Sequence, residues 1–196
     1  MHQQKYIGEL LEKFEMNSCN SISNSSETNS KIDECSEEER VDPTVFRQMV
    51  GSLRYLCNSR PYICYSVSVI RKFMHDPRKT HLIVAKRILG YVKGRKEYGL
   101  LFPNRSKGDR SELIGYLDSD WCGDITDKRN TSGYVFKFNE AAISLCTKKQ
   151  LVTALSSCEA EYIAGTFATC QAMWLDSMMK ELRCEVMKPL ILRIDN

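Results

Sequence analysis

The fold of this 196-residue chain is decided by the stretch Leu113-Ile-Gly-Tyr-Leu-Asp-Ser-Asp120. Its apolar first half predicts a strand over 113–117, which two acids follow. Polar or glycine-containing turns separate this strand from the other predicted strands, which cover 100–102, 133–138 and 142–146. A long helix is predicted over 157–182 and a buried strand over 190–194. Strands followed by a helix and one further strand are typical of the α/β class.

The long helix begins at a capping signal, Ser156-Ser-Cys-Glu159. Ser156 can cap the first turn, and Glu159 can reach back to the cap, as in a capping box. At about 100° per residue, Glu161 shares a face with the small and apolar residues of this helix, whereas Glu159 lies on the opposite side. Glu161 is therefore expected to point toward the sheet, where a carboxylate needs a partner or a metal.

Three carboxylates are candidates for one site: Asp118 after the first strand, Glu161 on the helix and Asp195 at the end of the last strand. Acid oxygens favour Mg²⁺ or Mn²⁺, and two such ions about 3.5 to 4 Å apart can serve an in-line phosphoryl displacement. Asp120 shares a strand face with Asp118, so either can be the ligand. Ordinary roles stay open, because acids also occur in turns and as helix caps.

The first half of the chain is predicted to be helical. Apolar spacing predicts a short helix over 3–16, and the Asp42-Pro43 start signal is followed by two packed helices with a break at Arg60-Pro61. A further helix is predicted over 79–93. Residues 17–42 are rich in Ser, Asn and Glu, a composition that predicts a flexible acidic loop.

Basic residues gather in the last of these helices. Nine Lys or Arg residues and one acid lie between Arg71 and Lys96. Within this region, lysines recur every seven residues on one helix face, about 10 Å apart. The face carries Lys79, Lys86 and Lys93, with Arg87 beside the middle one. Such a row can follow a phosphate backbone, although a solvated helix face without a ligand explains the pattern as well.

Composition narrows the class of protein. A formal net charge of +3 is too small to name a partner by itself. The sequence has neither a signal-peptide pattern nor a run of about 18 apolar residues, so we expect no secretion and no membrane insertion. The nine cysteines never occur as C-x-x-C, which argues against a disulfide framework or a local zinc site. An intracellular setting, cytoplasmic or nuclear, is expected.

Motifs in a fixed order add a resemblance to a known family. In the second half they are Gly115-Tyr-Leu-Asp-Ser-Asp-Trp-Cys-Gly-Asp124, Lys128-Arg-Asn-Thr-Ser-Gly-Tyr-Val-Phe136, Lys148-Lys-Gln150, Ala154-Leu-Ser-Ser-Cys-Glu-Ala-Glu-Tyr-Ile-Ala164 and Asp195-Asn196. This series resembles the ribonuclease H domain of copia-type retrotransposon polyproteins. Upstream, the motifs are Asp42-Pro43, Tyr55-Leu56, Arg60-Pro61, Phe73-Met74 and Ala85-Lys-Arg-Ile-Leu89. They resemble the connection between the reverse transcriptase and that domain.

The resemblance implies an organisation and a chemistry. It implies a helical connection region over 1–97 and a ribonuclease H-like domain over 98–196. It also implies that Asp118, Glu161 and Asp195 bind two Mg²⁺ or Mn²⁺ ions in a complete site, for hydrolysis of the RNA strand of an RNA/DNA hybrid. The resemblance thereby favours Asp118 over Asp120, and Glu161 over Glu159, as metal ligands. The basic helix face becomes a candidate track for the hybrid backbone.

The sequence also departs from that family. The family uses a fourth acid and further secondary structure after the strand that ends at Asp195, and this sequence has neither. We therefore expect an incomplete ribonuclease H-like fold, weak or absent activity of this chain alone, and the remainder of a polyprotein as a partner. It carries no Tyr-x-Asp-Asp motif, so we expect no polymerase site. Two alternatives stay open: a non-catalytic nucleic-acid-binding remnant and a pseudogene product.

Overall fold

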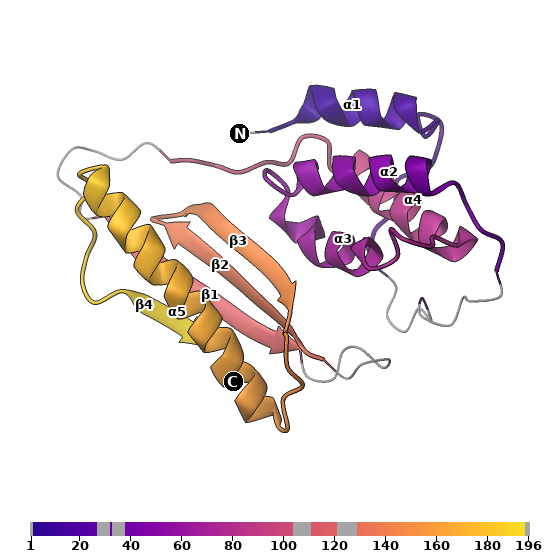
Figure 1. Ribbon diagram of the computed structural model, residues 1–196. Helices are drawn as coiled ribbons and strands as arrows, with labels where there is room; N and C mark the ends of the chain where they lie inside the picture. The colour runs from indigo at the N-terminus through magenta and orange to yellow at the C-terminus, as the bar shows by residue number, and fades with distance from the viewer. Residues whose placement is uncertain (1, 27–31, 33–37, 104–110, 121–128, 195–196) are drawn as a thin grey trace. The chain divides into compact units, whose positions relative to one another are not determined.

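The computed structural model describes residues 2–26, 32, 38–103, 111–120 and 129–194. They divide into two compact units, Met1–Leu100 and Leu101–Asn196 (Figure 1). Among these described residues, no helix has the length and apolar character needed to cross a membrane.

Unit 1 is helical. It contains α1 (Gln4–Lys13), α2 (Pro43–Leu56), the short 3-10 helix η2 (Pro61–Ile63), α3 (Cys64–Arg71) and α4 (Lys79–Lys93). Asp42 caps α2 as predicted, because its Oδ1 accepts the backbone N–H of Thr44 at 2.7 Å and Pro43 occupies the first turn. The helices share one core, whose fully buried members include Ile7, Leu11, Phe46, Leu53, Ile70, Ile88 and Leu89.

A buried arginine fixes the break between α2 and α3. Arg60 is fully buried, and its guanidinium donates to the carbonyls of Arg95 at 2.6 Å and Lys96 at 2.7 Å. Pro61 then begins η2. Because a buried charge is costly unless its donors are satisfied, these bonds tie the break to the residues that follow α4.

The start of segment 17–42 differs from the predicted flexible loop. The ammonium of Lys93 donates to the carbonyls of Asn17 at 2.6 Å and Cys19 at 2.5 Å, and the backbone N–H of Ile22 donates to Gly90 at 3.2 Å. Residues 27–31 and 33–37 lie outside the described part of the chain. Side-chain composition predicted flexibility here, whereas the described residues are held mainly through backbone groups.

Unit 2 is a four-stranded mixed sheet with one long helix. The strands are β1 (Leu113–Asp120), β2 (Thr131–Phe138), β3 (Ala141–Lys149) and β4 (Ile191–Ile194), in the order β3-β2-β1-β4. β2 is antiparallel to both neighbours, and β4 is parallel to β1. Helix α5 (Ser157–Glu181) links β3 to β4 and packs against one face of the sheet (Figure 1). The predicted α/β class is confirmed.

The buried face of α5 is built from small residues, which allow a close approach to the sheet. These residues pack against Leu113 and Leu117 of β1 and Phe136 of β2. The buried positions follow the predicted helical spacing and are Ala160, Ala164, Ala168, Ala172, Leu175 and Met179.

Two predicted strands need correction. Residues 100–102 form no strand, and Leu101 is 78% exposed. The last strand is not buried, because Ile191 is 42% and Ile194 53% exposed. Within the described sheet, β4 pairs on one side alone and α5 covers one face alone, so apolar residues of β4 stay open.

An ion cluster tethers the approach to β4. Asp176 of α5 accepts hydrogen bonds from Lys188, which lies three residues before β4 begins, and from Lys180 at 2.9 Å. The hydrogen bonds from Lys188 and Lys180 hold the pKa of Asp176 below its ordinary value. The position of β4 beside β1 therefore depends partly on this carboxylate.

Gly115 lies where neighbouring strands leave no room for a side chain. A Cβ there would lie 2.5 Å from Leu192 Cδ2 and 2.6 Å from Phe136 Cε1. We predict that Gly115→Ala lowers the free energy of unfolding by about 1 to 3 kcal/mol. The matched control is Gly133→Ala in β2, where the nearest atom would be the carbonyl oxygen of Cys146 at 3.8 Å. Urea unfolding measures both, and equal losses would contradict this packing.

The amide of Gln150 joins three elements of unit 2. Its Nε2 lies 2.9 Å from Ser132 Oγ of β2, 3.0 Å from the carbonyl of Ala160 in α5 and 3.3 Å from Ser119 Oγ of β1. Gln150 is 5% exposed, so these bonds form away from water. The start of α5 is thereby fixed against the carboxyl end of β1.

Removing this amide should loosen that corner of the sheet. We predict that Gln150→Ala lowers the free energy of unfolding by about 2 to 3 kcal/mol, because buried acceptors lose their donor. Gln171→Ala is the matched control, since Gln171 makes one bond, to Ser144 Oγ at 3.2 Å. Its expected loss is about 1 kcal/mol or less. A control variant as unstable as Gln150→Ala would overturn the special role of Gln150.

Candidate active site

Asp118 lies within β1, on the open face of the sheet. Its strand neighbours Leu117 and Ser119 are 3% and 9% exposed, and Leu117 belongs to the core beneath α5. Because side chains alternate along a strand, Asp118 projects from the other face, where it is exposed. Its partner on β2 is Gly133, which adds no side chain beside the carboxylate. Asp118 is thus accessible to a ligand.

Glu161 lies in the first turns of α5, directly after the residue that Gln150 contacts. It is half-buried, and its Oε2 atom is buried. The neighbouring positions Ala160 and Ala164 face the sheet at 0% and 2% exposure. This placement agrees with the helical spacing that separated Glu161 from Glu159.

Glu159 caps the helix, as predicted, with one difference of detail. Ser156 Oγ accepts the backbone N–H of Glu159 at 3.1 Å. The Glu159 carboxylate accepts the N–H of Leu155 at 2.6 Å, one residue before the position that a capping box uses. Its carboxylate is therefore bound to the backbone just before α5.

Asp195 lies outside the described residues. The last described residue of β4, Ile194, pairs with Leu117, the strand neighbour of Asp118. Gln150 meanwhile binds Ser119 and the carbonyl before Glu161. Asp118 near the carboxyl end of β1 and Glu161 in the first turns of α5 thus belong to elements that Gln150 joins, and β4 ends beside the same strand end.

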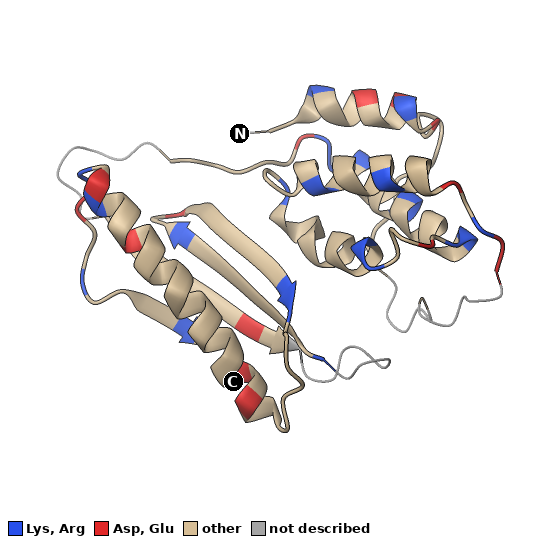
Figure 2. Ribbon diagram, in the orientation of Figure 1, with Lys and Arg blue, Asp and Glu red and all other residues tan. Residues whose placement is uncertain are grey.

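The donors at this strand end suit a hard cation in kind. Figure 2 shows acidic positions on β1 and in the first turns of α5. Within the described ranges, no three Asp, Glu, His or Cys side chains come together as a metal-binding group. Two of the three predicted ligands lie in those ranges, and both supply carboxylate oxygens, which Mg²⁺ and Mn²⁺ prefer. The donor chemistry fits the predicted ion.

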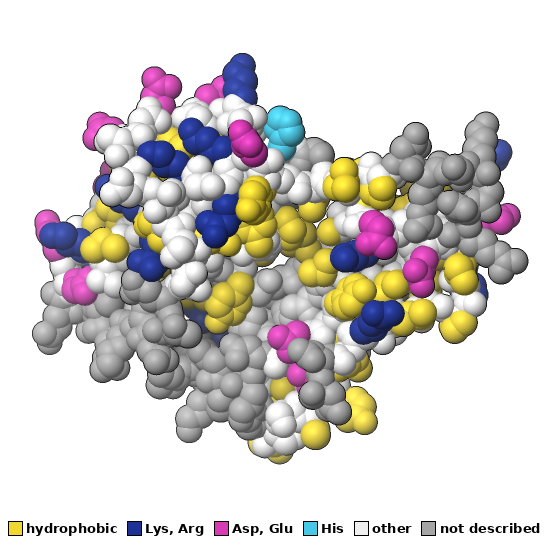
Figure 3. Space-filling view, turned by 180° about the vertical axis from the view of Figure 1, so that it is seen from behind, with side chains coloured by type: hydrophobic (Ala, Val, Ile, Leu, Met, Phe, Trp, Pro, Cys, Tyr) yellow, Lys and Arg dark blue, Asp and Glu magenta, His cyan; other side chains and the backbone are white. Residues whose placement is uncertain are grey.

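An aromatic residue with two cations lies close to Asp118 and was missed from the sequence. Tyr116 shares the open face with Asp118, two residues earlier in β1. Lys137 Nζ lies 5.7 Å and Arg193 Cζ 5.6 Å from its ring centroid. Seen from behind, unit 2 shows basic side chains among apolar ones (Figure 3). Strand alternation could have found Tyr116, but the two cations depend on strand pairing.

The basic row on α4 is partly occupied by the chain itself. Lys79 and Lys86 are exposed, and Arg87 is half-buried. Lys93 donates to two backbone carbonyls of the segment after α1, so its ammonium does not continue an open row. Helical periodicity correctly placed these residues on one helix, but it could not show what covers them.

Comparisons with known proteins find similarity to retrotransposon polyproteins along the whole chain. The chain is 34% identical over its whole length to a retrovirus-related Pol polyprotein from transposon RE1 of Arabidopsis thaliana. It is 34% identical over 189 residues, 93% of the chain, to the Pol polyprotein from transposon TNT 1-94 of Nicotiana tabacum. An uncharacterized mitochondrial protein of Arabidopsis thaliana is 32% identical over 89% of this chain and 71% of its own length.

The chain corresponds to a small part of each of these polyproteins. The chain spans 13% of the RE1 polyprotein and 14% of the TNT 1-94 polyprotein. No protein-family model matches the chain, and no solved structure matches it significantly. The full-length similarity to Pol polyproteins from two plants nevertheless identifies the family: the chain belongs to the retrovirus-related Pol polyproteins of copia-type transposons.

Proposed function

We propose that unit 2 is a ribonuclease H part of such a polyprotein, acting on the RNA strand of an RNA/DNA hybrid. The observation that carries this proposal is the arrangement at the carboxyl end of β1. Asp118 lies near that strand end and Glu161 lies in the first turns of α5, and Gln150 joins these two elements. The third proposed ligand, Asp195, follows Ile194 in the sequence.

In this proposal the side chains bind and orient, and none forms a covalent intermediate. Asp118 offers an exposed carboxylate, and its paired residue on β2, Gly133, adds no side chain beside it. Glu161 offers a carboxylate held from the helix side. A divalent cation held by these carboxylates would supply a water activated for attack and would stabilise the charge of the leaving oxygen.

Positive charge beside the acids supports a nucleic-acid substrate. Lys137 and Arg193 flank Tyr116 on the same sheet face as Asp118. Lysine and arginine neutralise phosphates, and the half-buried ring of Tyr116 can offer an edge or face to a sugar or base. On α4 of unit 1, Lys79 and Lys86 supply a second group of exposed cations.

The remainder of a Pol polyprotein is the proposed partner. The relatives carry this region within chains of which it forms about an eighth, since the aligned part is 13% of RE1. We propose that neighbouring parts of such a polyprotein complete the substrate-binding surface.

A non-catalytic role in binding nucleic acid is the second candidate. It is favoured by the exposed cations on both units. Binding of this kind should weaken steeply with salt and survive Asp118→Asn. Ribonuclease H cleavage should be lost in Asp118→Asn.

Cleavage of an end-labelled RNA/DNA hybrid by the chain, with Mg²⁺ and with Mn²⁺, tests the first proposal. We predict that Asp118→Asn and Glu161→Gln each reduce cleavage of the RNA strand by at least about 100-fold, since loss of even an outer-shell partner of a metal ligand costs about 10- to 100-fold. Glu159→Gln is the matched control, because it removes an equal charge two residues away and should keep most of the activity.

Two results would count against the proposal. Cleavage that persists in Asp118→Asn, or that falls equally in Glu159→Gln, contradicts the assigned ligands. Salt-sensitive binding of the hybrid without metal-dependent cleavage, by folded protein, supports the second candidate instead.

A further inference from the structure

An acidic segment is fastened to the start of the basic helix in unit 1. The backbone N–H of Val41 donates to Pro77 at 3.1 Å, and that of Lys79 donates to Glu39 at 3.1 Å. Arg40 and Arg78 form an antiparallel bridge between these bonds. Residues 38–42, here named the acidic clamp, are therefore paired through their backbone with the residues that open α4.

Glu38 supplies a cap that the local sequence of α4 lacks. The residue before the helix is Arg78, whose side chain has no hydrogen-bond acceptor. Glu38 takes that place from far along the chain, because its carboxylate accepts the Thr80 backbone N–H at 3.0 Å and the Thr80 hydroxyl at 2.7 Å. A negative charge at a helix N-terminus is stabilising. The same donors would suit a phosphate oxygen.

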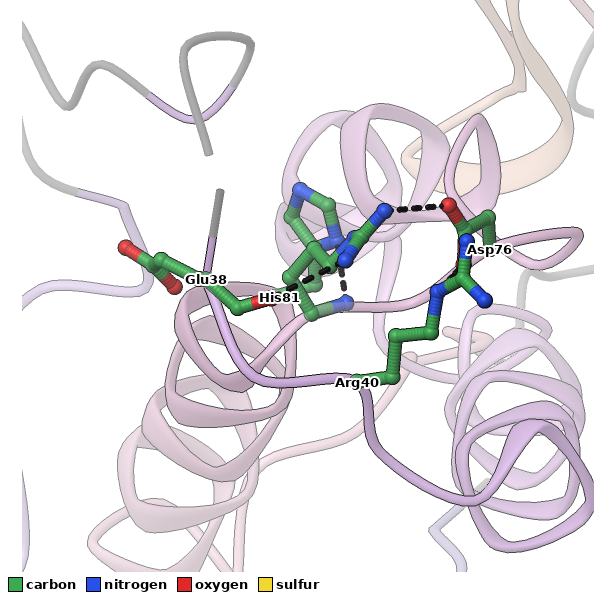
Figure 4. Close-up of polar contacts among 5 residues, drawn as sticks. Glu38, Arg40, Asp76 and His81 are labelled. Atoms are coloured by element: carbon green, nitrogen blue, oxygen red, sulfur yellow. Dashed lines mark hydrogen bonds and ion pairs between the residues drawn. The ribbon is translucent and has the colours of Figure 1, made fainter. Parts of the chain in front are cut away.

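Charged side chains and one histidine also hold the acidic clamp, through Arg78 at the start of α4 (Figure 4). Arg78 donates to the carbonyl of Glu38 at 2.9 Å and to Asp76 at 2.6 Å, and Arg40 lies 3.3 Å from the same aspartate. His81 accepts the backbone N–H of Arg78 through Nδ1 at 2.9 Å. The guanidinium of Arg78 thus joins the clamp to Asp76.

Glu39 makes a weaker contact that a phosphate can replace. Its carboxylate lies 3.9 Å from Lys79 Nζ, and the two side chains are 78% and 66% exposed. Exposed pairs of this kind contribute little and are screened by salt. Lys79 is the first cation of the basic row, so Glu39 places a negative charge where that row begins.

We propose that the acidic clamp is an autoinhibitory contact, which keeps nucleic-acid phosphates away from the first turn of α4 until they displace it. The proposal rests on the function proposed above, in which the exposed cations of α4 contribute to binding of a nucleic acid. Glu38 occupies the N–H group and hydroxyl of Thr80, and Glu39 occupies Lys79. A polyanion competes for the same three groups.

Equilibrium binding separates inhibition from simple capping. The chain is titrated with a fluorescein-labelled RNA/DNA hybrid in EDTA, and anisotropy is followed at several salt concentrations. We expect the double variant Glu38→Gln with Glu39→Gln to bind about fivefold more tightly at low salt. The slope of log K against log salt should steepen by about 0.9, because Lys79 becomes available to one phosphate.

Three further variants make the result decisive. Glu9→Gln with Glu12→Gln removes the same charge from the exposed face of α1 and should change affinity less than twofold. Glu39→Gln alone leaves the Glu38 cap in place, so it tests release of Lys79 without loss of the cap. Lys79→Gln with Lys86→Gln should weaken binding and flatten the salt slope.

The outcomes distinguish the two proposals. If the lysine variant binds more weakly but neither clamp variant binds more tightly than the α1 control, the acidic clamp is a helix cap and the inference is overturned, while the α4 track stands. If the lysine variant binds as the unaltered chain does, the track fails and the clamp proposal fails with it. Tighter binding and a steeper slope in Glu39→Gln support the inference.

Discussion

The hydrogen bonds of one buried amide, that of Gln150, are the constraint on which the rest of unit 2 depends. They tie β1, β2 and the start of α5 at one corner. Small residues along α5 bring the helix close to the sheet. A face of small residues does not by itself fix the position of the helix along the sheet, because shifted packings differ little in energy. A buried amide with fixed partners sets the register instead. Glu161 is consequently held beside the strand that carries Asp118.

Much of the fold followed from periodicity. Helix α4 begins and ends at the predicted residues, and α5 ends one residue before the predicted position. The errors concern pairing. Apolar residues at 100–102 suggested a strand, but strand formation needs a partner that local sequence does not specify. β4 was predicted to be buried because its residues are apolar, whereas exposure depends on its neighbours in space.

The acidic residues of the candidate site could be predicted from the sequence, whereas the side chains around them could not. Helical angles distinguished Glu161 from Glu159, and strand alternation placed Asp118 on a face. The two cations around Tyr116 depend on the register of β1 with β2 and with β4 and could not be read from spacing. The same limit applies to Lys93 and Glu38, whose partners are distant backbone groups or a distant helix end. Sequence patterns identify charges, and the fold decides what each charge meets.

The central claim is that acids at the carboxyl end of β1 bind a divalent cation. The most direct test is a titration of the ¹⁵N-labelled chain with Mn²⁺, a paramagnetic ion that erases NMR signals of nearby amides. The account predicts that signals of Asp118, Glu161 and Ile194 disappear first, and that Asp118→Asn prevents this at the same Mn²⁺ concentration. Signals that vanish first in unit 1, or at the same concentration in Asp118→Asn, would contradict it.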